Sequence, residues 1–457
     1  MDENLSEIVI TKISSVNLPI LKPAVFWFIA ILLHALGFAQ ALHSGSIYLV
    51  DSIDYLSQAS NLSSYGSLYA APWNLPIKPD YFSFRPPIYG MLICCIKSLV
   101  QTDYAILFIQ SIISLSTIWG VLKFSQELRL NEEICHLIVL ILLVIYPSQI
   151  IHCNFVMSDI LFQSLLFWSL YFTYRLWTQK QLKDSLLAVL FFALAMLTKP
   201  VAFLLGISVA GMLLFIFIKQ KRIQLLLPFL LLPLIYHVYA SYNKQVTGYY
   251  HYSSVTPIFV LKYMAKYTNA QIHGETYADE AQDSIMQFAN AAKTYQERYE
   301  LMNQAGKEII SQHPAFFIWF NVKGWVAFML DPGRFEWVHF LNINEGNYLG
   351  LYHVINTQGF LNGIIHFASN APIVLISILL ICLLTNIGIS LCFIHFLGNK
   401  KVPMALKICV FIFISYIVVS TGVLGLSRYR VAVAPMLWLS VMYGISYFIK
   451  NNEHAHS

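Results

Sequence analysis

The chain has 457 residues, of which 58% are hydrophobic and 11% are charged, with a formal net charge of +5 at pH 7. Soluble domains carry about 25% charged residues, so this composition excludes an ordinary soluble globular protein. It does not favour nucleic-acid binding either, because most Lys and Arg residues stand in short clusters between apolar segments. We predict an all-α polytopic membrane protein with about 10–12 transmembrane helices, whose partners include membrane lipids but no nucleic acid.

Ten apolar segments are predicted to be transmembrane helices. They cover residues 24–43, 104–123, 134–151, 157–174, 184–198, 201–218, 222–241, 372–397, 404–424 and 431–449. Ala39-Gln40-Ala41 resembles a signal-peptide cleavage site, but the long acidic segment before the first helix favours an uncleaved helix. Two shorter apolar segments, 86–100 and 315–330, are predicted not to cross the membrane.

The polar segments divide the chain into three parts. Residues 1–241 form an N-terminal transmembrane core, which includes a long first outer loop at 44–103 with amphipathic helices. Residues 242–371 form a small outer-face domain, and residues 372–457 form the C-terminal transmembrane helices. Within the outer domain, a helix is predicted from about 279 to 312.

Basic clusters between the predicted spans set the orientation, because short cytoplasmic loops are rich in Lys and Arg. Three such clusters all face the cytoplasm if both termini are cytoplasmic: Arg175, Lys180 and Lys183; Lys219, Lys221 and Arg222; Lys400 and Lys401. The opposite, outer face then receives the 44–103 loop, the Thr198-Lys199-Pro200 turn, the 242–371 domain and the turn at 425–430.

Four cations on the outer face break the charge rule: Arg85, Lys199, Arg428 and Arg430. One explanation for each is snorkelling, in which a long side chain carries its charge to the lipid phosphates. Four cations on one face, with acids beside them, favour a shared anion site instead. Ionisable groups within membrane spans are costly and usually functional.

Two carboxylates, Asp51 and Asp54, follow the first span and open an amphipathic helix that is predicted to run to about Leu62. Their spacing of three residues places both on one face of that helix. Asp51 could alternatively cap the helix, a common structural role for Asp. A third acid, Asp159, opens the span at 157–174 and has the same two alternatives.

Several motifs resemble those of the C-type (GT-C) membrane glycosyltransferases, and they span the chain from 24 to 449. In chain order they are "VDSIDYLSQASNL", "FRPPIYGMLICCIKSL", "YPSQIIHCNFVMSDILFQSLLFWSLYF", "LAMLTKPVAFLL", "YASYNKQVTGYY", "AGKEIISQHPAFFIWF" and "SRYRVAVAPMLWLS". The chain is most similar to the bacterial branch related to glycosyltransferase family 39. It departs from that pattern at Ser52, where Glu is common, and at Tyr242, where Arg is common.

The resemblance implies a GT-C helical core and an inverting transfer of a sugar from a polyprenyl-phosphate donor to a lipid, glycan or protein acceptor. It implies a bacterial inner membrane protein with its active site on the periplasmic face. Asp51 matches the first-loop acid and is the expected base, and Asp54 and Asp159 are the other candidate catalytic acids. The expected donor-phosphate ligands are Arg85, Lys199, Arg428 and Arg430, and the expected sugar contacts are Tyr55 and Tyr429. Tyr429 could alternatively be an anchor at the membrane interface. Fixed cations near the leaving phosphate stabilise charge that grows in the transition state.

Metal binding is a second role for Asp54 and Asp159, whose oxygens suit Mg²⁺ or Mn²⁺. Some GT-C enzymes use a metal and others do not, so no cofactor is required by the resemblance. His152 and His251 each lack a second His at ligand spacing, which favours core or interface roles. The seven cysteines are odd in number and mostly lie in apolar segments, so no disulfide framework is predicted.

Two other functions stay open at this stage. A transporter or flippase for a lipid-linked sugar would show paired repeats and broken helices, and no convincing repeat is present. An O-antigen ligase or polymerase acts on similar donors and needs a large outer loop rich in Arg and His, which the 242–371 region provides.

Overall fold

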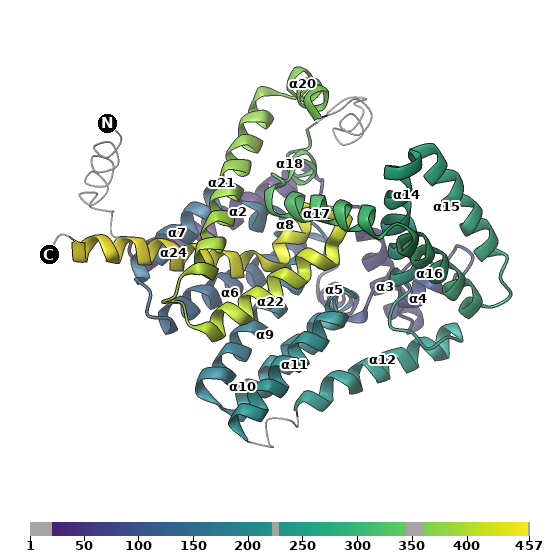
Figure 1. Ribbon diagram of the computed structural model, residues 1–457, viewed down its shortest axis with the longest axis horizontal. Coiled ribbons are helices and arrows are strands. Elements are labelled where there is room, and N and C mark those ends of the chain that lie inside the picture. The colour runs from purple at the N-terminus through teal and green to yellow at the C-terminus, as the bar shows by residue number, and fades with distance from the viewer. Residues whose placement is uncertain (1–20, 222–227, 344–359, 456–457) are drawn as a thin grey trace.

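The computed structural model describes residues 21–221, 228–343 and 360–455. Within these residues every regular element is a helix, as the composition predicted (Figure 1). The ten predicted spans correspond to helices α2 (Pro23–Ser44), α6 (Tyr104–Glu127), α7 (Glu132–Ile145), α9 (Asp159–Gln179), α10 (Leu182–Met196), α11 (Ala202–Gln220), α12 (Leu231–Thr247), α21 (Ile373–Gly398), α22 (Met404–Thr421) and α24 (Ala434–Ala455). Residues 222–227 of the span predicted at 222–241 lie outside the described residues. The all-α fold class is therefore confirmed.

Four described helices, α2, α6, α21 and α22, are long and apolar enough to cross a membrane by length and composition. Ala202–Ile218 within α11, α5 (Pro87–Leu99) and α17 (Pro314–Leu330) are shorter apolar helices. The span predicted at 134–151 is interrupted, because α7 ends before Pro147 and the short helix α8 (Ser148–Cys153) follows it. Proline has no backbone N–H to continue the helical hydrogen bonds. The number of helices that cross the membrane stays a prediction.

The predicted outer helix at 279–312 is wrong as a single helix. The structure has α15 (Glu275–Asn290) and α16 (Tyr295–Gln312), separated by a turn. The second helix starts with a capping box, in which Thr294 Oγ1 accepts the Glu297 N–H and the Glu297 carboxylate accepts the Thr294 N–H, each at 3.2 Å. This pattern satisfies free N–H groups at a helix start, so it fixes a new helix there.

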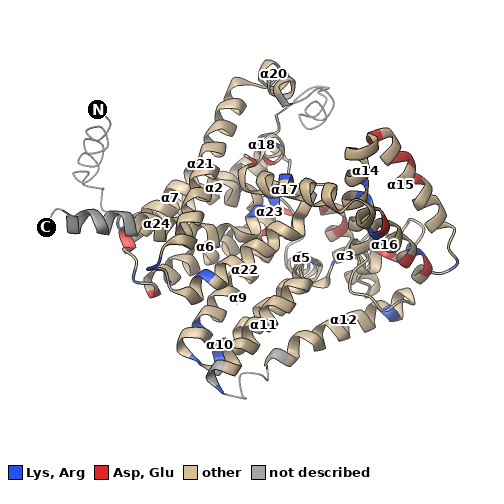
Figure 2. Cartoon of the chain, viewed as in Figure 1, with Lys and Arg blue, Asp and Glu red and all other residues tan. Residues whose placement is uncertain are grey.

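The region that contains α15 and α16 also has α13 (Val255–Phe259), a π-helical turn (Val260–Ala265) and α14 (Lys266–His273). Acidic residues are visible along α15 and α16, whereas the long helices elsewhere are mostly uncharged (Figure 2). α12 runs past the domain boundary predicted at 241, and residues 344–359 lie outside the described part of the chain. The predicted three-part division stays a prediction.

Two large apolar clusters hold most of the helices together. The larger one joins α2, α6, α7, α9, α10, α11, α22 and α24. The smaller one packs α3 (Ser52–Tyr65) and α5 against α6 and α8, through buried side chains that include Tyr55, Tyr89, Ile93 and Phe155. In addition, the Ile88 N–H of α5 donates to the Leu197 carbonyl at the end of α10, at 3.0 Å. The loop at 44–103, predicted to lie on the outer face, is thereby fixed beside the turn that carries Lys199.

Candidate active site

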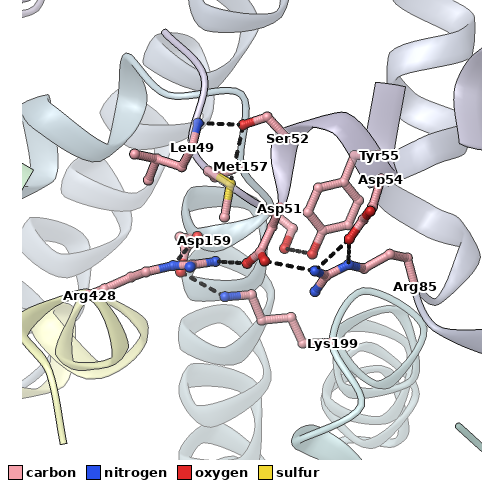
Figure 3. Close-up of polar contacts among 11 residues, drawn as sticks. Leu49, Asp51, Ser52, Asp54, Tyr55, Arg85, Met157, Asp159, Lys199 and Arg428 are labelled. Carbon is pink, nitrogen blue, oxygen red and sulfur yellow. Dashed lines mark hydrogen bonds and ion pairs between the residues drawn. The ribbon is translucent and has the colours of Figure 1, made fainter. Parts of the chain in front are cut away.

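The predicted acids and three of the predicted cations meet in one cluster, although they come from distant parts of the chain (Figure 3). All of them lie at helix ends or in turns. Asp51 and Asp54 stand at the start of α3, and Asp159 stands at the start of α9. Arg85 lies between α4 (Asp80–Ser83) and α5, Lys199 lies between α10 and α11, and Arg428 is in the short helix α23 (Ser427–Arg430). We call these six residues the charge cluster.

Asp51 is at the centre of the charge cluster and bridges two arginines. Its Oδ1 lies 2.8 Å from Arg85 Nη2, and its Oδ2 lies 2.6 Å from Arg428 Nη2. Asp51 makes no capping hydrogen bond to α3, so the alternative role as a helix cap is wrong. The carboxylate is used for side-chain ion pairs.

The other two acids extend this pattern in both directions. Asp54 Oδ2 accepts from Arg85 Nε at 3.0 Å and Nη2 at 2.8 Å. At the other end, Asp159 Oδ1 lies 2.6 Å from Lys199 Nζ, and its Oδ2 lies 3.5 Å from Arg428 Nε. Asp159 makes no capping bond either. The result is a continuous row of alternating charges in which three carboxylates balance three cations.

The surroundings set different pKa values for the two first-loop acids. Burial opposes ionisation of Asp51, but the charges of Arg85 and Arg428 outweigh it and lower the pKa of Asp51. For Asp54, burial outweighs the single partner Arg85 and raises the pKa. Burial also lowers the pKa of Lys199, against the opposing effect of Asp159. Asp51 is therefore more firmly ionised than Asp54, and it is also a weak base while both arginines hold it.

Tyr55 was predicted to contact the substrate, but the structure places it beneath the charge cluster. Its side chain is buried, and its hydroxyl lies 2.8 Å from Ser158 Oγ. The Arg85 guanidinium lies over its ring, 5.1 Å from the centroid, and over the ring of Phe84 at 4.7 Å. Tyr55 thus supports Arg85 through a cation–π contact.

Arg430 does not join the charge cluster. It is buried and donates to the carbonyls of Phe328 at 2.9 Å, Met329 at 2.7 Å and Asp331 at 2.8 Å, and to the Tyr146 hydroxyl. The last carbonyl groups of a helix have no hydrogen-bond donors within that helix, and the Arg430 guanidinium donates to those of α17. Its role in this structure is to hold α17, instead of the predicted phosphate contact. The neighbouring Tyr429 is half-buried against the larger apolar cluster.

Sequence reasoning missed the residues that hold the turn with Arg428. The Ser427 N–H donates to Asp331 Oδ2 and the Ser427 hydroxyl donates to Glu336 Oε1, each at 2.7 Å. Burial, and then the charge of Asp331, raise the pKa of Glu336 to about 6. The Asp331-Pro332-Gly333 sequence predicts a turn after α17, but it does not indicate that Asp331 and Glu336 contact Ser427, which is 96 and 91 residues away from them.

The residues present do not suit a metal ion. Among the described residues, no group of three His, Cys, Asp or Glu side chains could hold one. The two predicted ligands already have cationic partners. Asp54 pairs with Arg85 at one end of the charge cluster, and Asp159 pairs with Lys199 and Arg428 at the other end. His152 is fully buried, and this burial lowers its pKa to about 4.

Comparisons with known proteins bear on the same region. Residues 85–242 match the family model of dolichyl-phosphate-mannose-protein mannosyltransferases. This match supports a GT-C glycosyltransferase. It starts at Arg85 and includes Asp159 and Lys199, whereas Asp51, Asp54 and Arg428 lie outside it. The resemblance predicted from the motifs is confirmed at this level, and the chain is an integral membrane protein.

Two solved structures are also similar. They are the crystal structures of ArnT from Cupriavidus metallidurans, one bound to undecaprenyl phosphate and one in the apo state. The first is 12% identical, with a TM-score of 0.37, and covers 93% of this chain and 77% of that chain. The second is 11% identical, with a TM-score of 0.36, and covers 93% and 78%. No curated protein matches the chain.

Proposed function

We propose that the chain is an inverting glycosyltransferase that moves a sugar from a polyprenyl-phosphate donor to a hydroxyl group of a glycan, lipid or protein acceptor. The observation that carries the proposal is the charge cluster, where cations suited to a phosphate adjoin a carboxylate suited to a hydroxyl proton. The matched family is described as using dolichyl-phosphate mannose, a donor of the same chemical class. The site lies on the periplasmic face of a bacterial inner membrane in this proposal.

The donor phosphate binds Arg428 and Lys199, with Arg85 behind them. All three side chains are largely buried, with 14–19% of their surface exposed, so their charges act in a medium of low dielectric constant. The contact between Arg428 Nε and Asp159 is the longest ion pair of the charge cluster, at 3.5 Å. A guanidinium can give a phosphate two parallel hydrogen bonds, so Arg428 exchanges carboxylate partners for the phosphate when the donor arrives.

Donor binding also prepares the base in this mechanism. While Arg428 holds Asp51 Oδ2 at 2.6 Å, that oxygen is a poor proton acceptor. When Arg428 turns to the phosphate, Oδ2 is released and its affinity for a proton rises. The acceptor oxygen then attacks the anomeric carbon, and its proton passes to Asp51. The carbon–oxygen bond to the phosphate breaks with its electron pair on the phosphate. A single displacement of this kind inverts the anomeric centre.

Asp54 keeps Arg85 in place during these steps, because it accepts two hydrogen bonds from the same guanidinium. Arg85 therefore remains paired with Asp51 Oδ1 while Oδ2 is freed. This leaves Asp51 oriented by one arginine and chemically available on its other oxygen. Pairing of one oxygen while the other reacts fixes the direction of the proton transfer.

The test is sugar transfer in membranes of cells that express the protein, with a panel of radiolabelled undecaprenyl-phosphate hexoses and pentoses. Wild type should transfer at least one sugar, and Asp51→Asn should reduce the rate by roughly 10²–10⁴-fold, the usual contribution of a positioned base. Asp103→Asn is the matched control, since Asp103 pairs with Lys97 at 2.8 Å in the same outer loop but outside the charge cluster.

Equal transfer by wild type and Asp51→Asn would remove Asp51 from the mechanism. Failure of the wild type with every donor would contradict glycosyl transfer itself and favour the flippase alternative. Loss in both Asp51→Asn and Asp103→Asn would assign the effect to folding of the outer loop.

A further inference from the structure

The short turn that leads to Arg85 is held by a histidine 168 residues away. Ser83 is fully buried, and its Oγ lies 2.7 Å from His251 Nε2. The other ring nitrogen, Nδ1, lies 2.8 Å from the Tyr249 carbonyl oxygen. Because a carbonyl can only accept, Nδ1 carries the hydrogen, and Nε2 of the neutral ring accepts from the Ser83 hydroxyl.

Further contacts from the same segment hold this turn. Ser253 Oγ donates to the Ser83 carbonyl at 3.0 Å, and the Ser254 N–H donates to Ser83 Oγ at 3.2 Å. Ser254 Oγ donates to the Asp80 carbonyl at 2.7 Å, and Arg298 of α16 forms an ion pair with the Asp80 carboxylate. We call this set of contacts, together with the Ser83–His251 hydrogen bond, the loop clamp.

The Ser83–His251 hydrogen bond at the centre of the loop clamp is shielded from water. The His251 side chain is buried, and the rings of Tyr295 and Tyr299 on α16 cover it, with centroids 5.4 and 5.2 Å away. The Tyr295 hydroxyl lies 3.4 Å from Nε2. In such surroundings, a hydroxyl or ring nitrogen that loses its partner is not rescued by solvent, so the Ser83–His251 hydrogen bond is costly to break.

Arg85 lies two residues beyond Ser83 and has little freedom of its own. Its carbonyl accepts from Gln58 Nε2 at 2.7 Å, and Pro86 and Pro87 follow it at the start of α5. Proline fixes one backbone angle and restricts the residue before it. The chain at Arg85 is thus fixed from one side by α5 and from the other by the loop clamp.

We propose that His251 is a positioning residue that, through Ser83, holds the Arg85 guanidinium against Asp51 and Asp54. This role rests on the proposed function, because Arg85 orients the expected base. It also makes α16 and the 249–254 segment part of the machinery that builds the charge cluster, although none of their residues touches it. A displacement of about 1 Å in a positioned group can reduce a rate roughly 10²-fold.

Two substitutions at His251 separate this role from simple packing. In His251→Gln, the side-chain oxygen reaches the place of Nε2 and accepts from Ser83. In His251→Asn, the shorter amide reaches only the place of Nδ1, so the Ser83 hydroxyl loses its acceptor. We expect His251→Asn to lower kcat/KM for the donor by roughly 10–10²-fold and His251→Gln to retain most of the activity.

Hydrogen–deuterium exchange of peptides that cover residues 78–86 gives a readout that does not depend on activity. Exchange should be faster in His251→Asn than in wild type, and close to wild type in His251→Gln. His136→Asn is the matched control, because His136 is also buried and also bonds a backbone carbonyl through Nδ1, at 2.7 Å from Glu132 O, but lies outside the loop clamp.

Unchanged exchange at 78–86 in His251→Asn would overturn the loop clamp. Faster exchange with unchanged transfer would overturn the positioning of Arg85 by His251. If the wild type transfers sugar from no donor, the proposed function fails, and the exchange experiment still decides whether His251 holds this turn.

Discussion

Arg428 makes the most specific prediction, because it contacts two carboxylates with different nitrogen atoms. Its Nη2 is 2.6 Å from Asp51 and its Nε is 3.5 Å from Asp159. An ammonium group presents its charge at one point, so Lys at this position can pair with one acid but cannot span both. Arg428→Lys keeps the charge and loses the geometry, whereas Arg428→Met loses both.

The size of each effect follows from what the guanidinium does in the transition state. Removing one preorganised donor to a developing negative charge costs about 10²–10³ in kcat, or about 2.7–4 kcal/mol. We therefore expect Arg428→Met to reduce kcat/KM for the donor by about that factor. Arg428→Lys should retain the electrostatic part and fall by roughly tenfold, the effect of about 1.4 kcal/mol.

The assay is initial-rate sugar transfer at varied donor concentration, with each variant at matched membrane abundance. Lys97→Met is the control, since Lys97 pairs with Asp103 in the first outer loop and its removal leaves the charge cluster intact. Equal rates for Arg428→Lys and Arg428→Met would refute the geometric argument. A loss that appears only in the acceptor KM would refute the assignment of Arg428 to the phosphate.

Three further predictions concern stability. Lys199→Met leaves the buried Asp159 carboxylate without its closest partner, so it should destabilise the protein by about 3–5 kcal/mol. Adding Asp159→Asn to this variant should restore part of the lost stability. Thermal unfolding in detergent is the measurement, and an unchanged midpoint in Lys199→Met would contradict the prediction. Arg430→Met should cost about 3 kcal/mol or more, since three carbonyls lose a donor, without changing donor KM in the folded fraction. Burial raises the pKa of Glu336 from 4.5 to about 6. Between these two pH values the folded state binds more protons than the unfolded state, so the free energy of unfolding falls as the pH rises, by about 2 kcal/mol in total. Glu336→Gln should remove that slope from the pH dependence of the unfolding midpoint, and equal slopes in both proteins would count against it.

The helices and the membership of the charge cluster could largely be predicted from the sequence. Apolar segments of bilayer length located the long helices, and charges that break the loop rule pointed to the cations of the charge cluster. The sequence could not give the pairing, because Asp51 and Arg428 are 377 residues apart and only the packing of α3 against the rest of the fold brings them together. The supporting contacts of Asp331 and Glu336 are long-range in the same way.

Two errors had signals in the sequence. Arg428 and Arg430 are two residues apart in a short helix, and successive helical residues turn by about 100°, so the two side chains point to nearly opposite sides. Only one of them can face the charge cluster. The break in the helix predicted at 279–312 was marked by Thr294 followed by Glu297, the spacing of a capping box.

The most direct test of the account is to follow both products of one reaction. Purified protein in liposomes would receive a radiolabelled undecaprenyl-phosphate sugar, identified from the donor panel, together with acceptor extracted from membranes of the expressing cells. We expect one free undecaprenyl phosphate for each sugar transferred, with an inverted anomeric centre in the product. Movement of the intact donor across the bilayer, without cleavage of the sugar–phosphate bond, would contradict it.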